Sequence, residues 1–235
     1  MKNIIIASTS TIHGEKHLEY LLPELSIHFK DCKTLLFIPF ARPGGISHDE
    51  YTELVATTFK KINIKVQGIH ELEDPIMAIK EAEAIFTGGG NTFVLVSQLY
   101  AHKIMSTITE VVKNGTPYLG TSAGSNICGL SMQTTNDMPI VYPPSFQTLG
   151  LVPFNINPHY LDTDTTSKHM GETRETRINE FHAFNAIPVI GLREGSWIEV
   201  RNSKIKLRGT LSARLFRKGQ AAVEMEKNSD LTDLK

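Results

Sequence analysis

Short apolar runs alternate with longer amphipathic segments along the first half of the chain. Each apolar run predicts a strand, and the segments between the runs have the apolar spacing of helices. The predicted strands are residues 3–8, 34–40, 64–69, 84–90 and 117–122. The predicted helices are residues 16–30, 47–62, 74–82, 91–100 and 102–115. This alternation, with nearly continuous apolar strands, indicates an α/β fold: a mostly parallel sheet with helices on both faces.

The pattern changes in the second half of the chain. A strand is predicted to end at His159, followed by a helix over residues 171–185 and a strand over residues 187–195. Residues 196–209 and 213–225 have the alternation and turn residues of β-hairpins. The fold is therefore expected to add antiparallel hairpins toward its C-terminus.

Composition narrows the class of protein. The 235 residues include 24 Lys and Arg against 25 Asp and Glu, a balance that gives no general attraction to nucleic acid or anionic membranes. No apolar run approaches the roughly 20 residues that span a bilayer, and the N-terminal residues do not fit a signal peptide. The two cysteines form neither a metal spacing nor a disulfide framework. We expect a cytoplasmic protein.

Domain organisation follows from the absence of repeats, linkers and low-complexity stretches. We expect a single domain over residues 1–235. The last roughly eight residues are polar and are expected to be frayed.

A Gly-x-Ser-x-Gly pattern, Gly120, Ser122 and Gly124, lies between a predicted strand and a helix. In that context the serine occupies a strained, exposed turn and can act as a nucleophile. The same residues also fit a small-residue loop that merely closes a β–α unit. The nucleophile hypothesis therefore needs a base and an acid elsewhere in the chain.

His159 is the best candidate for the base because it ends a predicted strand. Two carboxylates compete to orient it, Asp137 and Glu194. Glu194 ends a predicted strand, as Ser122 and His159 do, and strand ends are expected to converge on one rim of the sheet. We therefore favour Glu194 as the acid, and Asp137 could instead bind a substrate ammonium. Each residue alone also fits a structural or surface role.

The loop Thr-Gly-Gly-Gly-Asn, residues 87–91, ends another predicted strand. It lacks the Gly-Lys-Ser/Thr of a phosphate-binding loop and the third glycine of a dinucleotide-binding loop. A backbone N–H of this loop, together with the N–H of Ala123, could bind a developing oxyanion.

Several long segments in one order resemble the peptidase E family of α-aspartyl dipeptidases. They run from Phe37 to Val200 and include FIPFA, DEYT, GGGNTF, SAG, TTNDMPIV, INPH, GETRE and IGL followed by EG. The resemblance implies a fold like that of the class I glutamine amidotransferases and hydrolysis of dipeptides with an N-terminal aspartate. It implies neither a metal nor a cofactor.

The resemblance also assigns roles to residues of this chain. It implies Ser122 as the nucleophile, His159 as the base and Gly90 as an oxyanion-binding residue. It leaves the acid open between Asp137 and Glu194.

Substrate specificity is implied for Arg174, in GETRE, as the residue that binds the aspartate side chain. Arg177 shares its helix face, and we expect it to pair with a surface glutamate or to pack within the helix. The partner is then a small peptide, with no nucleic acid or membrane, and the protein a monomer or homodimer. Alternatives are a hydrolase similar to cyanophycinase, or a non-catalytic binding module with an incomplete triad.

Overall fold

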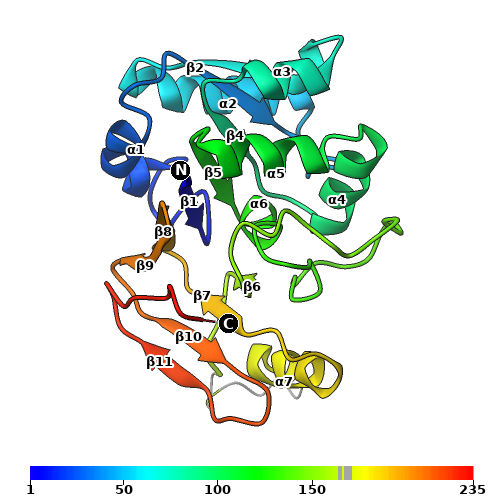
Figure 1. Cartoon of the computed structure of the whole chain (residues 1–235), viewed down its shortest axis with the longest axis vertical. Helices are drawn as coiled ribbons and strands as arrows, with labels where there is room; N and C mark the ends of the chain where they lie inside the picture. Colours follow the sequence, from blue (N-terminus) through cyan, green and yellow to red (C-terminus); the bar gives the residue numbers. More distant parts are fainter. Residues whose placement is uncertain (164–165, 167–170, 235) are drawn as a thin grey trace.

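The strands form two sheets in the computed structural model, which describes residues 1–163, 166 and 171–234 (Figure 1). A seven-stranded sheet has the order β3-β2-β4-β5-β1-β8-β9, and a four-stranded sheet has the order β11-β10-β7-β6. The strands are β1 (Asn3–Ala7), β2 (Thr34–Ile38), β3 (Lys65–Gly68), β4 (Ile85–Thr87), β5 (Tyr118–Thr121), β6 (Asn155–Pro158), β7 (Val189–Leu192), β8 (Ser196–Arg201), β9 (Lys204–Gly209), β10 (Ala213–Phe216) and β11 (Val223–Met225).

The five strands predicted from the first half of the chain pair in parallel within the larger sheet. The hairpin β8–β9 extends this sheet through an antiparallel pairing with β1. In the smaller sheet β6 and β7 are parallel, whereas β10 and β11 are antiparallel. The α/β fold and the C-terminal hairpins are confirmed. The expectation of one common rim is wrong, because β5 belongs to one sheet and β6 and β7 to the other.

Helices cover both faces of the larger sheet. The helices of the described residues are α1 (Leu22–His28), α2 (His48–Phe59), α3 (Pro75–Glu81), α4 (Thr92–Ala101), α5 (Met105–Asn114), α6 (Ala123–Asn126) and α7 (Arg174–Phe184), with short 3₁₀ turns at Glu19–Leu21, Lys60–Ile62 and Ile69–Glu71. Helices α1 and α2 pack on one face, and α3 to α6 contribute to the core on the other face. Alternation along β1 feeds both cores: Ile5 and Ala7 pack with α1 and α2, and Ile4 and Ile6 pack on the opposite side.

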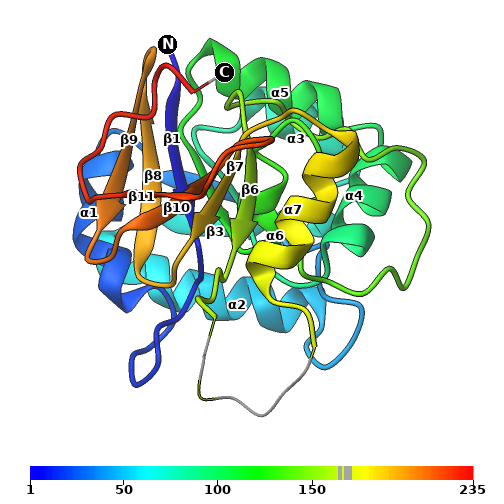
Figure 2. The same ribbon diagram turned by 90° about the horizontal axis from the view of Figure 1, so that it is seen from below.

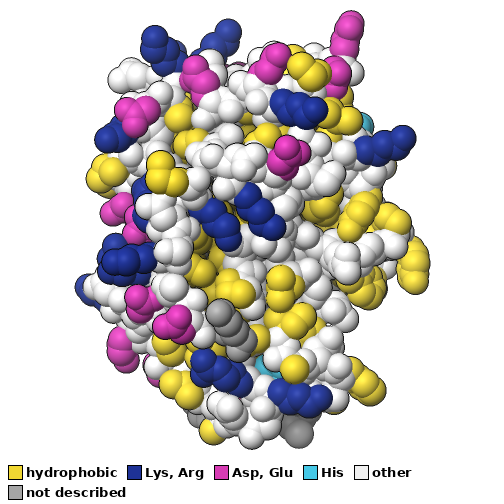
Figure 3. All heavy atoms as spheres, in the orientation of Figure 1, with side chains coloured by type: hydrophobic (Ala, Val, Ile, Leu, Met, Phe, Trp, Pro, Cys, Tyr) yellow, Lys and Arg dark blue, Asp and Glu magenta, His cyan; other side chains and the backbone are white. Residues whose placement is uncertain are grey.

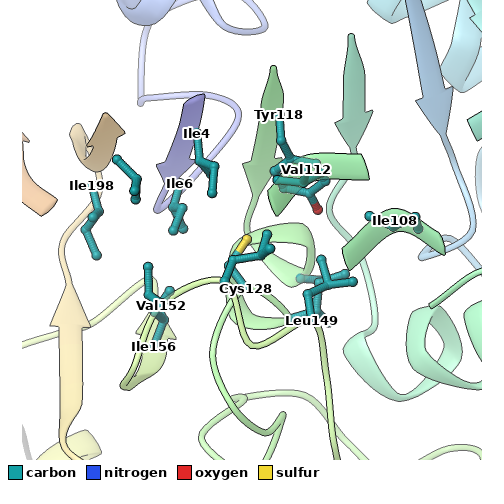
Figure 4. Packing of buried hydrophobic residues seen from close by; sticks show 14 of the residues in the cluster. Ile4, Ile6, Ile108, Val112, Tyr118, Cys128, Leu149, Val152, Ile156 and Ile198 are labelled. Carbon is teal, nitrogen blue, oxygen red and sulfur yellow. The ribbon is translucent and has the colours of Figure 1, made fainter. Parts of the chain in front are cut away.

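The core on the α3–α6 side joins the two sheets. Figure 4 shows Ile4 and Ile6 of β1 in the same cluster as Ile156 of β6, together with Cys128 and Leu149. Helix α7 covers the other face of the smaller sheet, and Figure 2 shows it beside β6 and β7. The smaller sheet is thus held between α7 and the main core.

The predicted helix over residues 16–30 begins later than expected. Leu18 has a left-handed backbone, with φ 55°, and the α-helix starts at Leu22, where Pro23 occupies its first turn. Proline suits that position because the first N–H groups of a helix have no partner within it. No helix of the described ranges is long and apolar enough to span a membrane.

The C-terminal segment is packed, so the expectation of frayed residues is wrong. The N–H of Leu231 donates to the Ile205 carbonyl, and the N–H of Leu207 donates to the Ser229 carbonyl. Leu231 and Leu234 are buried in the main core. Two leucines within a polar stretch suffice to anchor it, because each fully buried leucine stabilises by about 1.5–3 kcal/mol.

Candidate active site

Ser122 lies on a tight turn between β5 and α6. Its backbone has φ 55° and ψ −112°, a conformation that residues other than glycine rarely adopt. The Ser122 N–H donates to the Ala7 carbonyl at 3.2 Å, so the turn is anchored to the neighbouring strand β1. The local geometry therefore agrees with the strand–turn–helix context predicted for the Gly-x-Ser-x-Gly pattern.

Both glycines of that pattern are required by close backbone packing. A Cβ atom on Gly124 would lie 2.1 Å from the Thr87 carbonyl oxygen of β4. A Cβ atom on Gly120 would lie 2.4 Å from the Gly124 carbonyl oxygen. Any side chain at either position would push α6 away from the sheet and move Ser122 with it.

His159 follows the last residue of β6 and lies between Ser122 and Glu194. Its Nε2 is 2.8 Å from Ser122 Oγ, and its Nδ1 is 2.6 Å from Glu194 Oε1. The carboxylate can only accept, so Nδ1–H donates to Glu194 and leaves Nε2 free to accept the serine proton. The histidine and glutamate side chains are 35% and 45% exposed, which leaves this pair open to a substrate.

The backbone of His159 is fixed by a buried serine from the other sheet. Ser8 directly follows β1, and its Oγ accepts a hydrogen bond from the His159 N–H at 2.9 Å. The same hydroxyl donates to the Leu192 carbonyl at 2.7 Å, and the Tyr160 N–H donates to that carbonyl at 3.1 Å. Ser8 therefore joins the ends of β1, β6 and β7 where the three side chains meet.

Glu194 lies in the short loop between β7 and β8, beside a strongly paired arginine. Arg193 donates to both carboxylate oxygens of Asp162 at 2.8 Å and to Glu224 at 2.5 Å. These hydrogen bonds raise the pKa of Arg193. The loop that carries Glu194 is thereby tied to β11.

Asp137 occupies a different place from Glu194. Its Oδ2 accepts hydrogen bonds from the Thr92 N–H at 2.7 Å, the Thr92 hydroxyl at 2.6 Å and the Thr135 hydroxyl at 3.0 Å. Thr92 is the first residue of α4, where free N–H groups and the helix dipole favour an anion. Among the described residues, Asp137 makes no hydrogen bond to His159.

Apolar side chains lie around the Asp137 side of the site. A cavity of about 580 Å³ is lined by Asp137 together with Phe93, Phe146 and Phe184. The segment after α6 also exposes apolar side chains; Tyr142, for example, is 93% exposed. Figure 3 shows hydrophobic side chains gathered on this side of the molecule.

Arg174 is the first residue of α7, with Thr173 as its N-cap. Partial burial, and then the charge of Arg177, lower the pKa of Arg174, whereas Asp137 acts in the opposite direction. Among the described residues, Arg174 makes no hydrogen bond or ion pair. Arg177 does pair, with Glu172 at 3.7 Å, which confirms the surface pair expected for it.

The loop after β4 packs directly against Ser122. A Cβ atom on Gly89 would lie 3.3 Å from Ser122 Oγ, and one on Gly90 would lie 2.2 Å from the Ala41 carbonyl oxygen. Gly90 has φ 145°, which permits this approach. In the described part of the chain, neither the Gly90 N–H nor the Ala123 N–H donates a hydrogen bond. Both are free to bind an oxygen of a ligand.

Sequence reasoning missed two residues that hold the site. Apart from its position at the end of a predicted strand, nothing in the sequence around Ser8 indicates a role in the site. Tyr51 lies within DEYT, one of the matching segments, but no role was predicted for it. Its hydroxyl accepts a hydrogen bond from the Gly89 N–H at 3.0 Å and would lie 2.6 Å from a Cβ on Gly88. Tyr51 therefore holds the backbone of the glycine loop in place.

A serine on a strand–turn–helix elbow, hydrogen-bonded to a histidine on an α/β fold, is the arrangement typical of serine hydrolases. The sequence model of peptidase family S51 matches residues 4–208, and the chain belongs to this family.

Relatives of similar length extend this comparison. The chain is 47% identical to "Peptidase E" of Streptomyces coelicolor over 232 residues, covering 99% of this chain and 94% of that protein. It is 45% identical to "Probable alpha-aspartyl dipeptidase" of Drosophila melanogaster over 236 residues, covering 99% and 97%.

Solved structures resemble the fold at low sequence identity. A putative peptidase E protein from Listeria monocytogenes EGD-e has a TM-score of 0.66 at 21% identity and covers 89% of this chain and 99% of that chain. A peptidase from an acI-B1 Actinobacterium has a TM-score of 0.69 at 14% identity and covers 98% and 96%. These two comparisons concern the fold alone.

Proposed function

We propose that the protein is an α-aspartyl dipeptidase that hydrolyses Asp-Xaa through a Ser122–His159–Glu194 triad. The observation that carries the proposal is the position of His159, with Ser122 Oγ on one ring nitrogen and Glu194 on the other. The printed names of the relatives from Streptomyces coelicolor and Drosophila melanogaster support the substrate class.

The first half of the proposed reaction forms an acyl-enzyme. Ser122 Oγ attacks the peptide carbonyl carbon while His159 Nε2 takes the hydroxyl proton. The carbonyl oxygen becomes an oxyanion, which the N–H groups of Gly90 and Ala123 bind. His159 then returns the proton to the leaving nitrogen, the C–N bond breaks, and residue Xaa departs with a free amine.

The second half releases aspartate. His159 takes a proton from water, the resulting hydroxide attacks the aspartyl ester, and the proton returns to Ser122 Oγ. Throughout, Glu194 holds the Nδ1–H tautomer and stabilises the imidazolium that forms twice in the cycle. The reaction needs only these side chains, backbone N–H groups and water.

Recognition of the N-terminal aspartate is assigned to Arg174 and Asp137. Among the described residues, no carboxylate binds the half-buried guanidinium of Arg174, so its fork is available to the substrate side chain. Asp137 has one carboxylate oxygen engaged by Thr92 and Thr135, and the other can bind the substrate ammonium. A cytoplasmic location suits this peptide substrate and the two free cysteines, Cys32 and Cys128.

The proposal is tested with purified protein, Asp-Leu and Asn-Leu, and an Asp–Arg polymer. We expect hydrolysis of Asp-Leu, poor hydrolysis of Asn-Leu and none of the polymer. Ser122→Ala should reduce turnover by on the order of 10⁶ while keeping the fold. Cleavage of the polymer in preference to Asp-Leu would favour the cyanophycinase-like alternative. Failure of the wild-type protein to cleave any of the three substrates would favour the alternative of a non-catalytic binding module.

A further inference from the structure

Arg42 is an exposed cation tied to the loop that touches the proposed nucleophile. It follows β2, and its Nε donates to the Gly89 carbonyl at 3.2 Å. A Cβ on Gly89 would lie 2.8 Å from Ser122 Cβ, so a single residue separates the guanidinium from Ser122. Arg42 also lies over the ring of Tyr51, with Cζ 5.2 Å from the ring centroid.

These contacts hold the guanidinium while leaving its outer edge free. Nε is used by Gly89, and the cation–π contact with Tyr51 restricts the orientation of the planar group. Among the described residues, no carboxylate forms an ion pair with Arg42. The Tyr51 hydroxyl also acts as a side-chain hydrogen-bond partner of Arg42. The guanidinium N–H groups that neither Gly89 nor Tyr51 uses can bind an anion such as a carboxylate.

Most arginines of the described residues are paired with a carboxylate. Five arginines form ion pairs with Asp or Glu: Arg177, Arg193, Arg201, Arg208 and Arg214. The described arginines without such a partner are Arg42, Arg174 and Arg217. Arg174 already has a proposed anionic partner in the substrate, which raises the question of what Arg42 binds.

We propose that Arg42 binds the C-terminal α-carboxylate of the dipeptide, an inference that rests on the proposed function. The scissile carbonyl and the C-terminal carboxylate of a dipeptide are one residue apart, about 3.5 Å in an extended chain. A protein group that binds this carboxylate must therefore lie close to the carbonyl carbon that Ser122 attacks. Arg42 is the candidate because it and Ser122 both lie against Gly89.

The surface next to Arg42 has room for the second substrate residue. A hollow of about 370 Å³ is lined by residues 42–48. Gly44 and Gly45 border it, and a Cβ on either would meet nothing within 4 Å. The carboxylate can be bound by Arg42 while the Xaa side chain extends over this open loop, so recognition depends on the charge rather than on the side chain.

The test compares Asp-Leu with Asp-Leu amide, which lacks the terminal charge. Wild type should prefer Asp-Leu by about 10–100-fold in kcat/KM, the worth of a charged hydrogen-bonded pair. Arg42→Gln should lower kcat/KM for Asp-Leu by that factor, mainly through KM, and change the amide by no more than about twofold. Arg217→Gln, the control, removes an arginine of the β10–β11 loop that has no carboxylate partner among the described residues, and should change the hydrolysis of neither substrate.

Each other outcome overturns the inference in a recognisable way. An equal loss on both substrates would mean that Arg42 acts through the Gly89 backbone, and no loss on either would exclude a role. If Arg42→Gln does not fold, the test is the ratio of the wild-type kcat/KM for Asp-Leu to that for Asp-Leu amide. Equal values for the two substrates overturn the inference. Wild type inactive on both substrates would overturn the proposed function as well.

Discussion

The backbone N–H of His159 donates a hydrogen bond to Ser8 Oγ at 2.9 Å, although the two residues lie 151 positions apart in the chain. The bond runs between the two sheets, because Ser8 follows β1 and His159 follows β6. The position of the proposed base is thus set by the hydroxyl of a residue that follows a strand of the larger sheet.

Replacing Ser8 should impair catalysis more than stability alone explains. Ser8→Ala removes the acceptor for the His159 N–H and the donor to the Leu192 carbonyl. We expect a loss of about 1–3 kcal/mol in the free energy of unfolding. We also expect kcat to fall by about 10–100-fold, because displacement of a catalytic group by about 1 Å has that effect.

Ser131→Ala is the matched control, since this buried serine also makes two side-chain hydrogen bonds but lies away from His159. It should lower stability and leave kcat nearly unchanged. Equal kcat values for the two variants would contradict a positioning role of Ser8.

The two candidate acids should separate in steady-state kinetics. Glu194→Gln replaces the carboxylate that accepts from His159 Nδ1, so kcat should fall by about 10²–10⁴-fold. Asp137→Asn should mainly raise KM for Asp-Leu, because that residue is assigned to the substrate ammonium. Circular dichroism checks that both variants fold. The opposite pattern would exchange the two roles.

Arg174 and Arg177 should differ although both lie in the first turn of α7. Arg174→Ala should reduce kcat/KM for Asp-Leu by about 10²–10⁴-fold, since the substrate carboxylate loses its paired guanidinium. Arg177 lines the cavity beside Asp137, but its charge is paired with Glu172 in an exposed ion pair worth about 0–1 kcal/mol, so Arg177→Ala should have a much smaller effect. Small, equal losses in both variants would move the specificity residue elsewhere.

Acid should destabilise the fold through buried His28 and partly buried His17. Burial, followed by the charge of Arg42, lowers the pKa of His17 to about 4, and burial, followed by the charge of Arg201, lowers that of His28 to about 3. Below pH about 6.5 the unfolded chain binds protons that the folded chain excludes, so the free energy of unfolding falls as the pH decreases. Each histidine adds a slope of up to about 1.4 kcal/mol per pH unit.

Denaturant titrations between pH 7 and pH 4.5 measure that slope. His17→Gln and His28→Gln should each flatten it, and the double variant should flatten it further. A slope that is unchanged in the double variant would show that other groups govern the acid sensitivity.

The packed C-terminal segment should contribute to stability. Leu231 is fully buried in the main core, and Leu231→Ala should lower the free energy of unfolding by about 2–5 kcal/mol. Leu211, which is 46% exposed, provides the control, because Leu211→Ala creates no cavity in that core. If the two variants unfold at the same denaturant concentration, the segment does not contribute.

Local features of the sequence predicted most of the elements, whereas contacts between distant residues could not be predicted. The Ser122 turn was located because its glycines and its flanking strand and helix are chain neighbours. The division into two sheets had no such signal, since β5 and β7 are both short apolar strands buried on both faces. Ser8 and Tyr51 act on residues 151 and 38 positions away, and nothing in their own neighbourhood indicates it.

The proposed triad is divided between two sheets, so kcat depends on how the two sheets are positioned relative to each other. Ser122 follows β5 of the larger sheet, His159 follows β6 of the smaller sheet, and Glu194 lies in the loop that joins β7 to β8, one strand of each sheet. A slight sliding of one sheet on the other would break the 2.8 Å contact between His159 and Ser122 while every strand kept its partners. Mild heating or low denaturant should then switch the enzyme off reversibly before the secondary structure melts, so that inactivation reports misalignment rather than unfolding.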